Sequence, residues 1–129
     1  MRFSKTSVMA LDALVVIGRN GAFSPIPLRQ IAGEIKASPT YLSKILQHLS
    51  SAGLVVAVMG AHGGYRPAKK MSEISILEVV ELFEKPATVG GEPVGKEEKE
   101  KKDGTAILSK ALLAALANLS QTTVADIID

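Results

Sequence analysis

Six polar residues between positions 38 and 47 have the types and spacing that suit contact with a nucleic acid. Hydroxyl, amide and ammonium groups recur there at intervals of three and four residues, and none of the six side chains is acidic. On a helix this spacing gathers side chains on one face, where such groups hydrogen-bond to phosphates and base edges. The pattern predicts double-stranded DNA as a partner, contacted through Ser38, Thr40, Tyr41, Ser43, Lys44 and Gln47. For Tyr41, packing against the first helix is the equal alternative.

A second polar group lies in the stretch VMGAHGGYRPAKK, from Val58 to Lys70. Its glycines permit positive φ and close approach to a backbone, and Arg66 brings positive charge near phosphates. A P-loop is excluded because no Gly-Lys-Ser/Thr opens a helix here, and a dinucleotide loop is excluded because G-x-G-x-x-G is missing. We therefore expect a hairpin laid against DNA, with Arg66 and His62 as contacts. Simple exposure is the alternative for His62, and Tyr65 is expected to pack against the domain.

Residues for catalysis or for metal binding are scarce. The chain has no cysteine, which removes disulfides, thiolate nucleophiles and thiolate-ligated clusters. His48 and His62 lie on different predicted elements without a nearby carboxylate, so no metal site and no cofactor is expected. Glu78, Glu81 and Glu84 recur along a predicted solvent face with no partner for acid–base work. The sequence therefore predicts a protein that is not an enzyme.

Charge divides the chain into two halves. Residues 1–70 hold nine Lys and Arg against two acids, a net +7, whereas residues 71–129 have a net charge of −5. This asymmetry indicates that only the first half meets a polyanion. No apolar run approaches 18 residues, and Asp12 interrupts the apolar start without a cleavage site after it. We expect a cytoplasmic, nucleoid-associated protein with no membrane segment.

Hydrophobic spacing predicts the elements that position the polar groups. A helix over 5–18 is followed by a second with Pro27 at its first position, and by a third that begins at the N-cap Ser38 and stops at Gly53. A turn of about three residues between the second and third helices is typical of a helix-turn-helix. A strand over 54–59 and its return form a wing. The expected apolar faces of the first three helices are Val8, Leu11, Leu14 and Val15, with Ala10, Ala13 and Ile17 alongside, then Leu28, Ile31, Ala32 and Ile35, and then Leu42, Ile45, Leu46 and Leu49. In a further helix over 72–84, Ile76, Val79, Val80 and Phe83 are expected to face inward.

The fold class predicted is mainly α with a small β-hairpin wing. Residues 1–84 form the winged helix-turn-helix domain, ending in a helix over 72–84, and residues 85–104, which lack periodicity, form a flexible linker. Residues 105–129 form a long apolar helix and a short final one. A helix apolar over so much of its girth needs a partner, and a homodimer is expected. The alternative is a helix folded back over its own winged domain.

Several stretches in this order resemble one family: MRFSKTSVMALDAL, PLRQIAGEIKASPTYLSKILQHLSSAGLV, GAHGGYR, ISILEVVELFE and TVADI. Together they resemble the winged helix-turn-helix transcriptional regulators that include IscR, NsrR and CymR, the Rrf2 family. The resemblance covers nearly the whole chain apart from the linker. It implies a dimeric regulator, with the winged domain near the N-terminus and a C-terminal dimerisation helix.

Three departures from that family pattern refine the expectation. Cluster-binding members carry three cysteines in the segment matching 85–104, so this chain resembles the cluster-free branch. Met59 stands where relatives have a wing arginine that can enter the minor groove, and Ala61 and His62 replace proline and glycine. Ser43 stands where some relatives carry an acidic specificity residue, which implies a different target sequence.

Two functions follow as hypotheses. The first is a sequence-specific DNA-binding regulator, a repressor in its simplest form, acting as a homodimer and open to a small-molecule or protein effector. The second is a winged-helix module that docks a partner protein without DNA. The net +7 of residues 1–70 and the acid-free helix face favour DNA.

Overall fold

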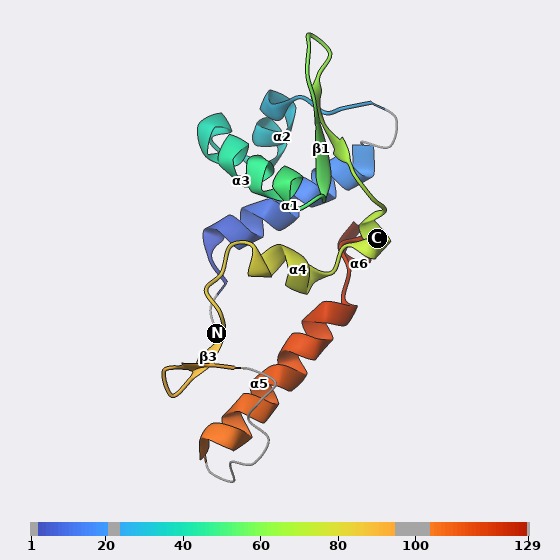
Figure 1. Ribbon diagram of the computed structural model, residues 1–129. Coiled ribbons are helices and arrows are strands. Elements are labelled where there is room, and N and C mark those ends of the chain that lie inside the picture. Colours follow the sequence, from blue (N-terminus) through green and yellow to red (C-terminus); the bar gives the residue numbers. More distant parts are fainter. Residues whose placement is uncertain (1–2, 21–23, 95–103, 129) are drawn as a thin grey trace.

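A computed structural model describes residues 3–20, 24–94 and 104–128 of the chain. Most of the predicted linker's charged run, residues 95–103, lies outside the described residues. The described part is mainly helical with two small antiparallel hairpins (Figure 1). Its elements are α1 (Lys5–Asn20), α2 (Leu28–Ile35), α3 (Pro39–Ser51), β1 (Val55–Val58), β2 (Gly64–Pro67), η1 (Met71–Glu73), α4 (Ile76–Glu81), β3 (Thr88–Val89), β4 (Glu92–Pro93), α5 (Gly104–Gln121) and α6 (Ala125–Ile128).

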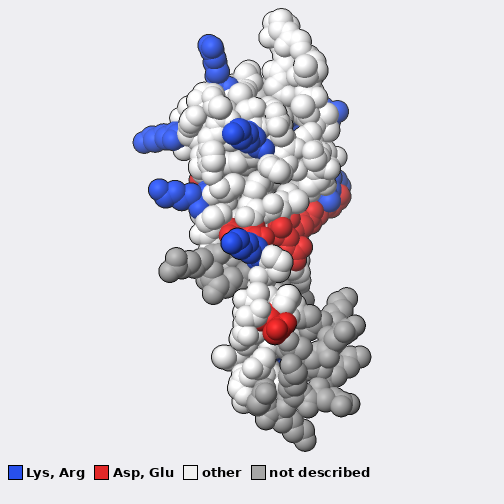
Figure 2. All heavy atoms as spheres, turned by 60° about the vertical axis from the view of Figure 1, so that its left-hand side comes forward, with Lys and Arg blue, Asp and Glu red and all other residues white. Residues whose placement is uncertain are grey.

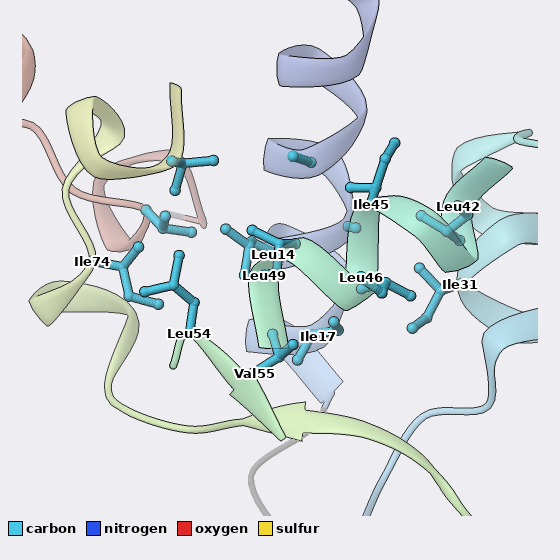
Figure 3. Packing of buried hydrophobic residues seen from close by; sticks show 14 of the residues in the cluster. Leu14, Ile17, Ile31, Leu42, Ile45, Leu46, Leu49, Leu54, Val55 and Ile74 are labelled. Atoms are coloured by element: carbon cyan, nitrogen blue, oxygen red, sulfur yellow. The ribbon is translucent and has the colours of Figure 1, made fainter. Parts of the chain in front are cut away.

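One hydrophobic core holds the winged part of the molecule together. The inward face of α3 is fully buried and meets the buried face of α1 and residues of α2 and β1 (Figure 3). The α1 face differs from the prediction at Val8, which is 51% exposed. Leu14 is buried as predicted, and Ala10, Ala13 and Ile17, expected alongside it, are buried with it. The small side chains of Ala10 and Ala13 let the other helices approach α1 closely.

The predicted helix-turn-helix is confirmed in its main features. Helix α2 begins one residue later than expected, since Pro27 is its extended N-cap rather than its first helical residue. The turn after α2 passes through Lys36, whose left-handed backbone (φ 57°) ends the helix. Ser38 then caps α3 as predicted, with its Oγ accepting from the Tyr41 amide at 3.4 Å and Pro39 following it. A fixed turn of this kind holds α3 at a set angle to α2.

The predicted wing is an antiparallel hairpin of β1 and β2 in which Val56 pairs with Arg66. It projects beyond the helices in Figure 1. Strand β2 is held to the rest of the domain by an isolated bridge between Ile26 and Tyr65, whose backbones exchange two hydrogen bonds of 2.9 Å. Tyr65 is half-buried against the core, as predicted.

The helix predicted over 72–84 is shorter in the structure. The short turn η1 precedes it, and α4 begins only after Ser75, which forms a reciprocal capping box with Glu78. Ser, Thr and Asp side chains favour such helix starts because they satisfy free backbone N–H groups. Ile76, Val79 and Val80 are buried, as predicted.

Glu84 is not the free solvent-face carboxylate that helical spacing predicts. It lies beyond the end of α4, and its Oε2 accepts hydrogen bonds from the Ser4 amide at 2.7 Å, the Ser4 hydroxyl at 2.8 Å and the Ser7 hydroxyl. These donors, from the Ser7 side chain first, lower the pKa of Glu84 below its ordinary range. The reason for the difference is tertiary, because the donors lie about eighty residues away at the start of α1.

The segment expected as a linker contains structure in its described part. Strands β3 and β4 form a small hairpin, with Thr88 opposite Pro93, and β3 contacts α5. Two successive glycines at its turn, Gly90 and Gly91, have positive φ, which a tight turn of this kind uses. The sequence pattern did not predict these strands, because each is only two residues long.

The C-terminal elements return to the winged core. Val124 is fully buried there, and residues Ser75 and Thr123 form an isolated bridge. The Ile76 amide donates to the Thr122 carbonyl and the Val124 amide to the Ile74 carbonyl. The short final helix α6 follows, as predicted. The C-terminal end of α5 is therefore fixed to the winged core, while its other end extends away (Figure 1).

Helix α5 is exposed over much of its surface. Ile107 is 70% exposed and Leu108 is 60% exposed, whereas Leu112, Leu116 and Leu119 are half-buried against the same chain. Contact of these residues with a second subunit stays a prediction, and Ile107 and Leu108 are the two most exposed of the five. Across the described residues, no helix is both long and apolar enough to cross a bilayer.

Candidate nucleic-acid interface

The structure brings the predicted polar residues of α3 onto one outward face. Thr40, Lys44 and Gln47 are exposed, and Ser43 beside them is half-buried. The opposite face of the helix is Leu42, Ile45, Leu46 and Leu49, which are fully buried. Because the buried face fixes the rotation of α3 about its axis, the polar face has one defined direction toward solvent.

Two hydrogen bonds hold the start of this face. Ser38 caps the helix, so its own side chain is committed to the backbone. The Tyr41 hydroxyl is hydrogen-bonded to the Thr6 hydroxyl on α1. Of the two roles predicted for Tyr41, the structure shows the contact with the first helix. This hydrogen bond connects α3 to α1. The spacing of residues in the sequence did not indicate that Thr6 would be the partner of Tyr41.

The wing presents the second group of predicted residues. Arg66 is exposed on β2, on the opposite side of the strand from Tyr65, as alternation along a strand requires. Its guanidinium donates weakly to its neighbour's carbonyl, that of Pro67, at 3.4 Å, which leaves most of its donors toward solvent. His62 and Met59 are exposed at the tip, where Met59 is 89% exposed. Residues 59–63 at the tip of the wing include no Lys, Arg, Asp or Glu, and the charge of Arg66 lies farther from the tip on β2.

Basic and acidic side chains gather on different parts of the face of the molecule shown in Figure 2. In Figure 2 most Lys and Arg side chains project from the winged part, and the acidic side chains gather in a band beneath it, with a few basic side chains beside them. Among the described residues the only ion pair joins Lys69 to Glu78, at 3.4 Å. Lys44 and Arg66 are thus without an acidic partner in this part of the chain. Unpaired cations beside an acid-free helix face favour contact with phosphates.

His48 and His62 do not meet. His48, on the flank of α3, lies edge-on to the Phe83 ring with centroids 5.8 Å apart, and His62 is at the wing tip. Neither the helices nor the hairpins that the structure describes gather three His, Cys, Asp or Glu side chains in a metal-binding arrangement.

The family model for Rrf2, described as an iron-dependent transcriptional regulator, matches residues 3–129. The chain belongs to the Rrf2 family. This family is one of transcriptional regulators and not of enzymes, as the sequence predicted. The family match also confirms the resemblance that the ordered sequence motifs indicate.

Individual relatives agree with the family. The chain is 32% identical over 84 residues to the protein rrf2 of Nitratidesulfovibrio vulgaris, over 65% of this chain and 56% of that one. It is 32% identical over 80 residues to the transcriptional regulator IscR of Escherichia coli, over 62% and 49% of the two chains. The matched region thus spans about half the length of these curated relatives. The structure of CymR, the global cysteine regulator of B. subtilis, superimposes with a TM-score of 0.83 at 24% identity, over 99% and 96% of the chains. That likeness confirms the winged-helix fold.

The residues of this chain do not fit the iron that the family description implies. Thiolates are the usual ligands of iron–sulfur clusters, and the chain has no cysteine. Its two histidines are separated on α3 and the wing, and the described carboxylates form no cluster with them. No step of the function below therefore involves a metal.

Proposed function

We propose that this protein is a sequence-specific DNA-binding transcriptional regulator that acts at the nucleoid without an iron–sulfur cluster. The observation that carries the proposal is the outward face of α3, where Thr40, Lys44 and Gln47 are exposed with no acidic side chain among them. In this arrangement α3 enters the major groove. Lys44 contacts a phosphate, and Gln47 pairs with a base edge, adenine being the base that a glutamine contacts with two hydrogen bonds.

The wing adds contacts beside the recognition helix. Arg66 contacts a phosphate, and His62 contacts the backbone or the minor groove at the wing tip. Met59, which replaces the arginine of relatives, brings no charge to the minor groove. Sequence preference therefore comes mainly from α3, and the wing supplies position and affinity.

A salt titration with matched variants tests this proposal. Affinity for duplex DNA is measured by fluorescence anisotropy at increasing salt, with duplexes selected from a random pool by the wild-type protein. Lys44→Ala should reduce the steepness of the salt dependence by about 0.9, the value for one phosphate contact. Gln47→Ala should relax base preference at one position. Lys110→Ala, on the distant helix α5, is the control and should change neither.

Salt-independent binding, or unchanged binding by both α3 variants, contradicts the proposal. Failure to select any duplex, together with capture of a protein partner through the same face, would instead support a protein-docking module.

We also propose that the protein is a homodimer joined through α5. Ile107 and Leu108 are exposed, and Ala111 and Ala115 lie exposed between their directions on the helix. Lys110 is the only charged residue of α5. Burying one large aliphatic side chain is worth about 1.5–3 kcal/mol, and small residues between two such side chains let helices approach closely. A second copy supplies an equal stripe across a two-fold axis.

Two copies would read a palindromic site with half-sites about 34–36 Å apart. A repressor occupying such a site, responsive to a small molecule or a protein effector, is the simplest regulator of this kind. Sedimentation should give a mass near twice 13.6 kDa. Ile107→Asp with Leu108→Asp should give monomers, whereas Leu113→Asp, at a partly exposed position on another side of α5, should remain dimeric. A wild-type protein that sediments as one chain rules out the dimer.

A further inference from the structure

The carboxylate of Glu84 joins two parts of the molecule that are far apart in the sequence. Its Oε2 accepts three hydrogen bonds from Ser4 and Ser7 at the beginning of α1. Ser7 is buried, so this contact is shielded from water on one side. Glu84 itself lies where the chain leaves the winged domain, just before the segment that continues to β3. These hydrogen bonds therefore fix the position at which the segment leading to β3 begins.

Packing does little to hold the segment after Glu84. Two hollows, of about 440 Å³ and 350 Å³, both border residues 84–87. The first is closed on one side by Leu112 and the second by Leu116, both on α5. Because close packing is what normally fixes a chain segment, a segment bordered by hollows depends more on its hydrogen bonds. The hydrogen bonds of Glu84 attach this segment to the start of α1.

Helix α5 is attached to the winged core at two places. Its C-terminal end is fixed by the bridge between Ser75 and Thr123 and by burial of Val124. Farther along, α5 contacts α4 and β3. The contact with β3 depends on the position of residues 84–87, and hence on Glu84. Without the contact with β3, α5 keeps its contact with α4 and its fixed C-terminal end, and fewer contacts oppose a change of its angle about that end.

The size of such a pivot is large on the scale of DNA. An α-helix of 18 residues is about 27 Å long. A rotation of ~10° about one end therefore moves the other end by about 5 Å, more than the ~3.4 Å that separates successive phosphates of a strand along the axis. In a symmetric dimer both halves shift, so a rotation of this size can change the separation between the recognition helices by about one base-pair step.

The same region touches the recognition helix directly. Thr6, between the two serines that bind Glu84, is hydrogen-bonded to Tyr41 of α3. Phe83, next to Glu84 in the chain, lies edge-on to His48, about two turns farther along α3. Helix α3 thus contacts both of the chain segments that Glu84 joins, which are the start of α1 and the residues just after α4. A displacement at Glu84 reaches α3 through short, direct contacts.

We propose that Glu84 is a positioning residue that sets the angle between the winged domain and α5, and through it the separation of the two recognition helices. The inference rests on the proposed function, since it assumes a dimer on DNA. Glu84 touches no DNA in this scheme. Its effect is on which half-site spacing the dimer accepts, while the bases read within a half-site stay the same.

A distance measurement tests the positioning without DNA. The chain has no cysteine, so Gln30→Cys on α2 and Lys110→Cys on α5 introduce two spin labels only. Labelled chains are diluted with unlabelled protein, and pulsed electron resonance gives the distribution of distances within a chain. The parent should show one narrow peak, and adding Glu84→Ala should broaden or split it. Glu81→Ala, which removes an exposed carboxylate one turn earlier, is the control and should leave the peak unchanged.

A second variant keeps the test decisive if Glu84→Ala unfolds. Ser4→Ala with Ser7→Ala removes both hydroxyl donors and keeps the carboxylate, and it should broaden the same peak. A peak as narrow in these variants as in the parent overturns the proposal, and so does a parent distribution that is already broad.

Selection from a random duplex pool gives the functional consequence. The wild-type dimer should enrich paired half-sites at one spacing, and Glu84→Ala should enrich the same half-sites at several spacings. A single retained spacing overturns the role of Glu84. If the wild type enriches no paired sites at all, the proposed function fails, and the distance measurement still decides what Glu84 does.

Discussion

Replacing Gly64 by alanine should loosen the wing from the winged core. Gly64 has a φ of +151°, and a Cβ built on it would lie 2.3 Å from the Ile26 carbonyl oxygen and 2.8 Å from the Pro27 nitrogen. Both are backbone atoms, so no side-chain rotation relieves the overlap. The chain must move apart where Ile26 and Tyr65 exchange two hydrogen bonds of 2.9 Å. The substitution therefore attacks the attachment of the wing and leaves its charged residues in place.

The magnitude follows from two contributions. A backbone conformation that side chains rarely adopt costs about 1–3 kcal/mol for a residue with a Cβ. Losing two backbone hydrogen bonds adds about 0.5–1.5 kcal/mol for each. Gly60 separates these contributions, because its φ of +104° is also positive but a Cβ there meets nothing within 4 Å. Gly60→Ala should thus show the first cost alone, and Gly64→Ala should exceed it by about 1–3 kcal/mol.

Urea unfolding followed by circular dichroism gives the free energy of unfolding of both variants and the parent. DNA affinity is measured on the same samples at a fixed salt concentration. Gly64→Ala should also bind duplex DNA more weakly than Gly60→Ala, because the wing and Arg66 lose their position. If the two variants are equally stable, the bridge between Ile26 and Tyr65 does not hold the wing, and the reasoning is refuted.

Three further predictions concern single side chains. Ser109 is buried in α5, and within the described residues its hydroxyl has no hydrogen-bond partner, so Ser109→Ala should raise the free energy of unfolding by about 1 kcal/mol in urea titrations. Ser38→Ala removes the cap of α3 and should lower that free energy by about 1 kcal/mol. The pKa of Glu84 is lower in the folded state than its ordinary 4.5. The contribution of this carboxylate to the free energy of unfolding is therefore present above that pH and is lost as the pH falls through the folded-state pKa. Glu84→Gln should remove this part of the acid dependence when unfolding is measured against pH.

Features with a local cause could be predicted from the sequence. The inward face of α3 and its Ser38 cap follow from periodicity and from one side chain beside its own helix. The wing follows from a β-branched strand before a run with several glycines. In each case the residues that decide the structure lie within a few positions of the feature, so spacing alone reveals it.

Features made by distant residues could not be predicted in this way. Glu84 had the spacing of a solvent-exposed residue, and its donors at Ser4 and Ser7 are about eighty positions away. Tyr41 fitted a DNA contact and a packing role equally well until Thr6 was found beside its hydroxyl. Nothing in a serine, a threonine or a glutamate identifies which remote partner it meets, because many folds place such groups on the surface.

Helix α5 shows the same limit for apolar residues. Its sequence is hydrophobic nearly all round, so periodicity did not separate the side facing its own chain from the side left open. The structure separates them through the contacts of α5 with α4 and β3, which cover Leu112 and Leu116.

The contacts of α1 connect the winged part of the molecule with the C-terminal end of the chain. This helix contacts α2, α3 and β2 of the winged part, and it also contacts α4 and α6. At Gly18 the approach is so close that a Cβ would lie 2.6 Å from Met71 Cγ and 2.8 Å from Ile128 Cδ1. The start of α1 receives Glu84 and the recognition helix, while its end receives the C-terminus. In the positioning role proposed for Glu84, α1 is the element through which a displacement of residues 84–87 reaches α3, because its start is hydrogen-bonded to both Glu84 and Tyr41.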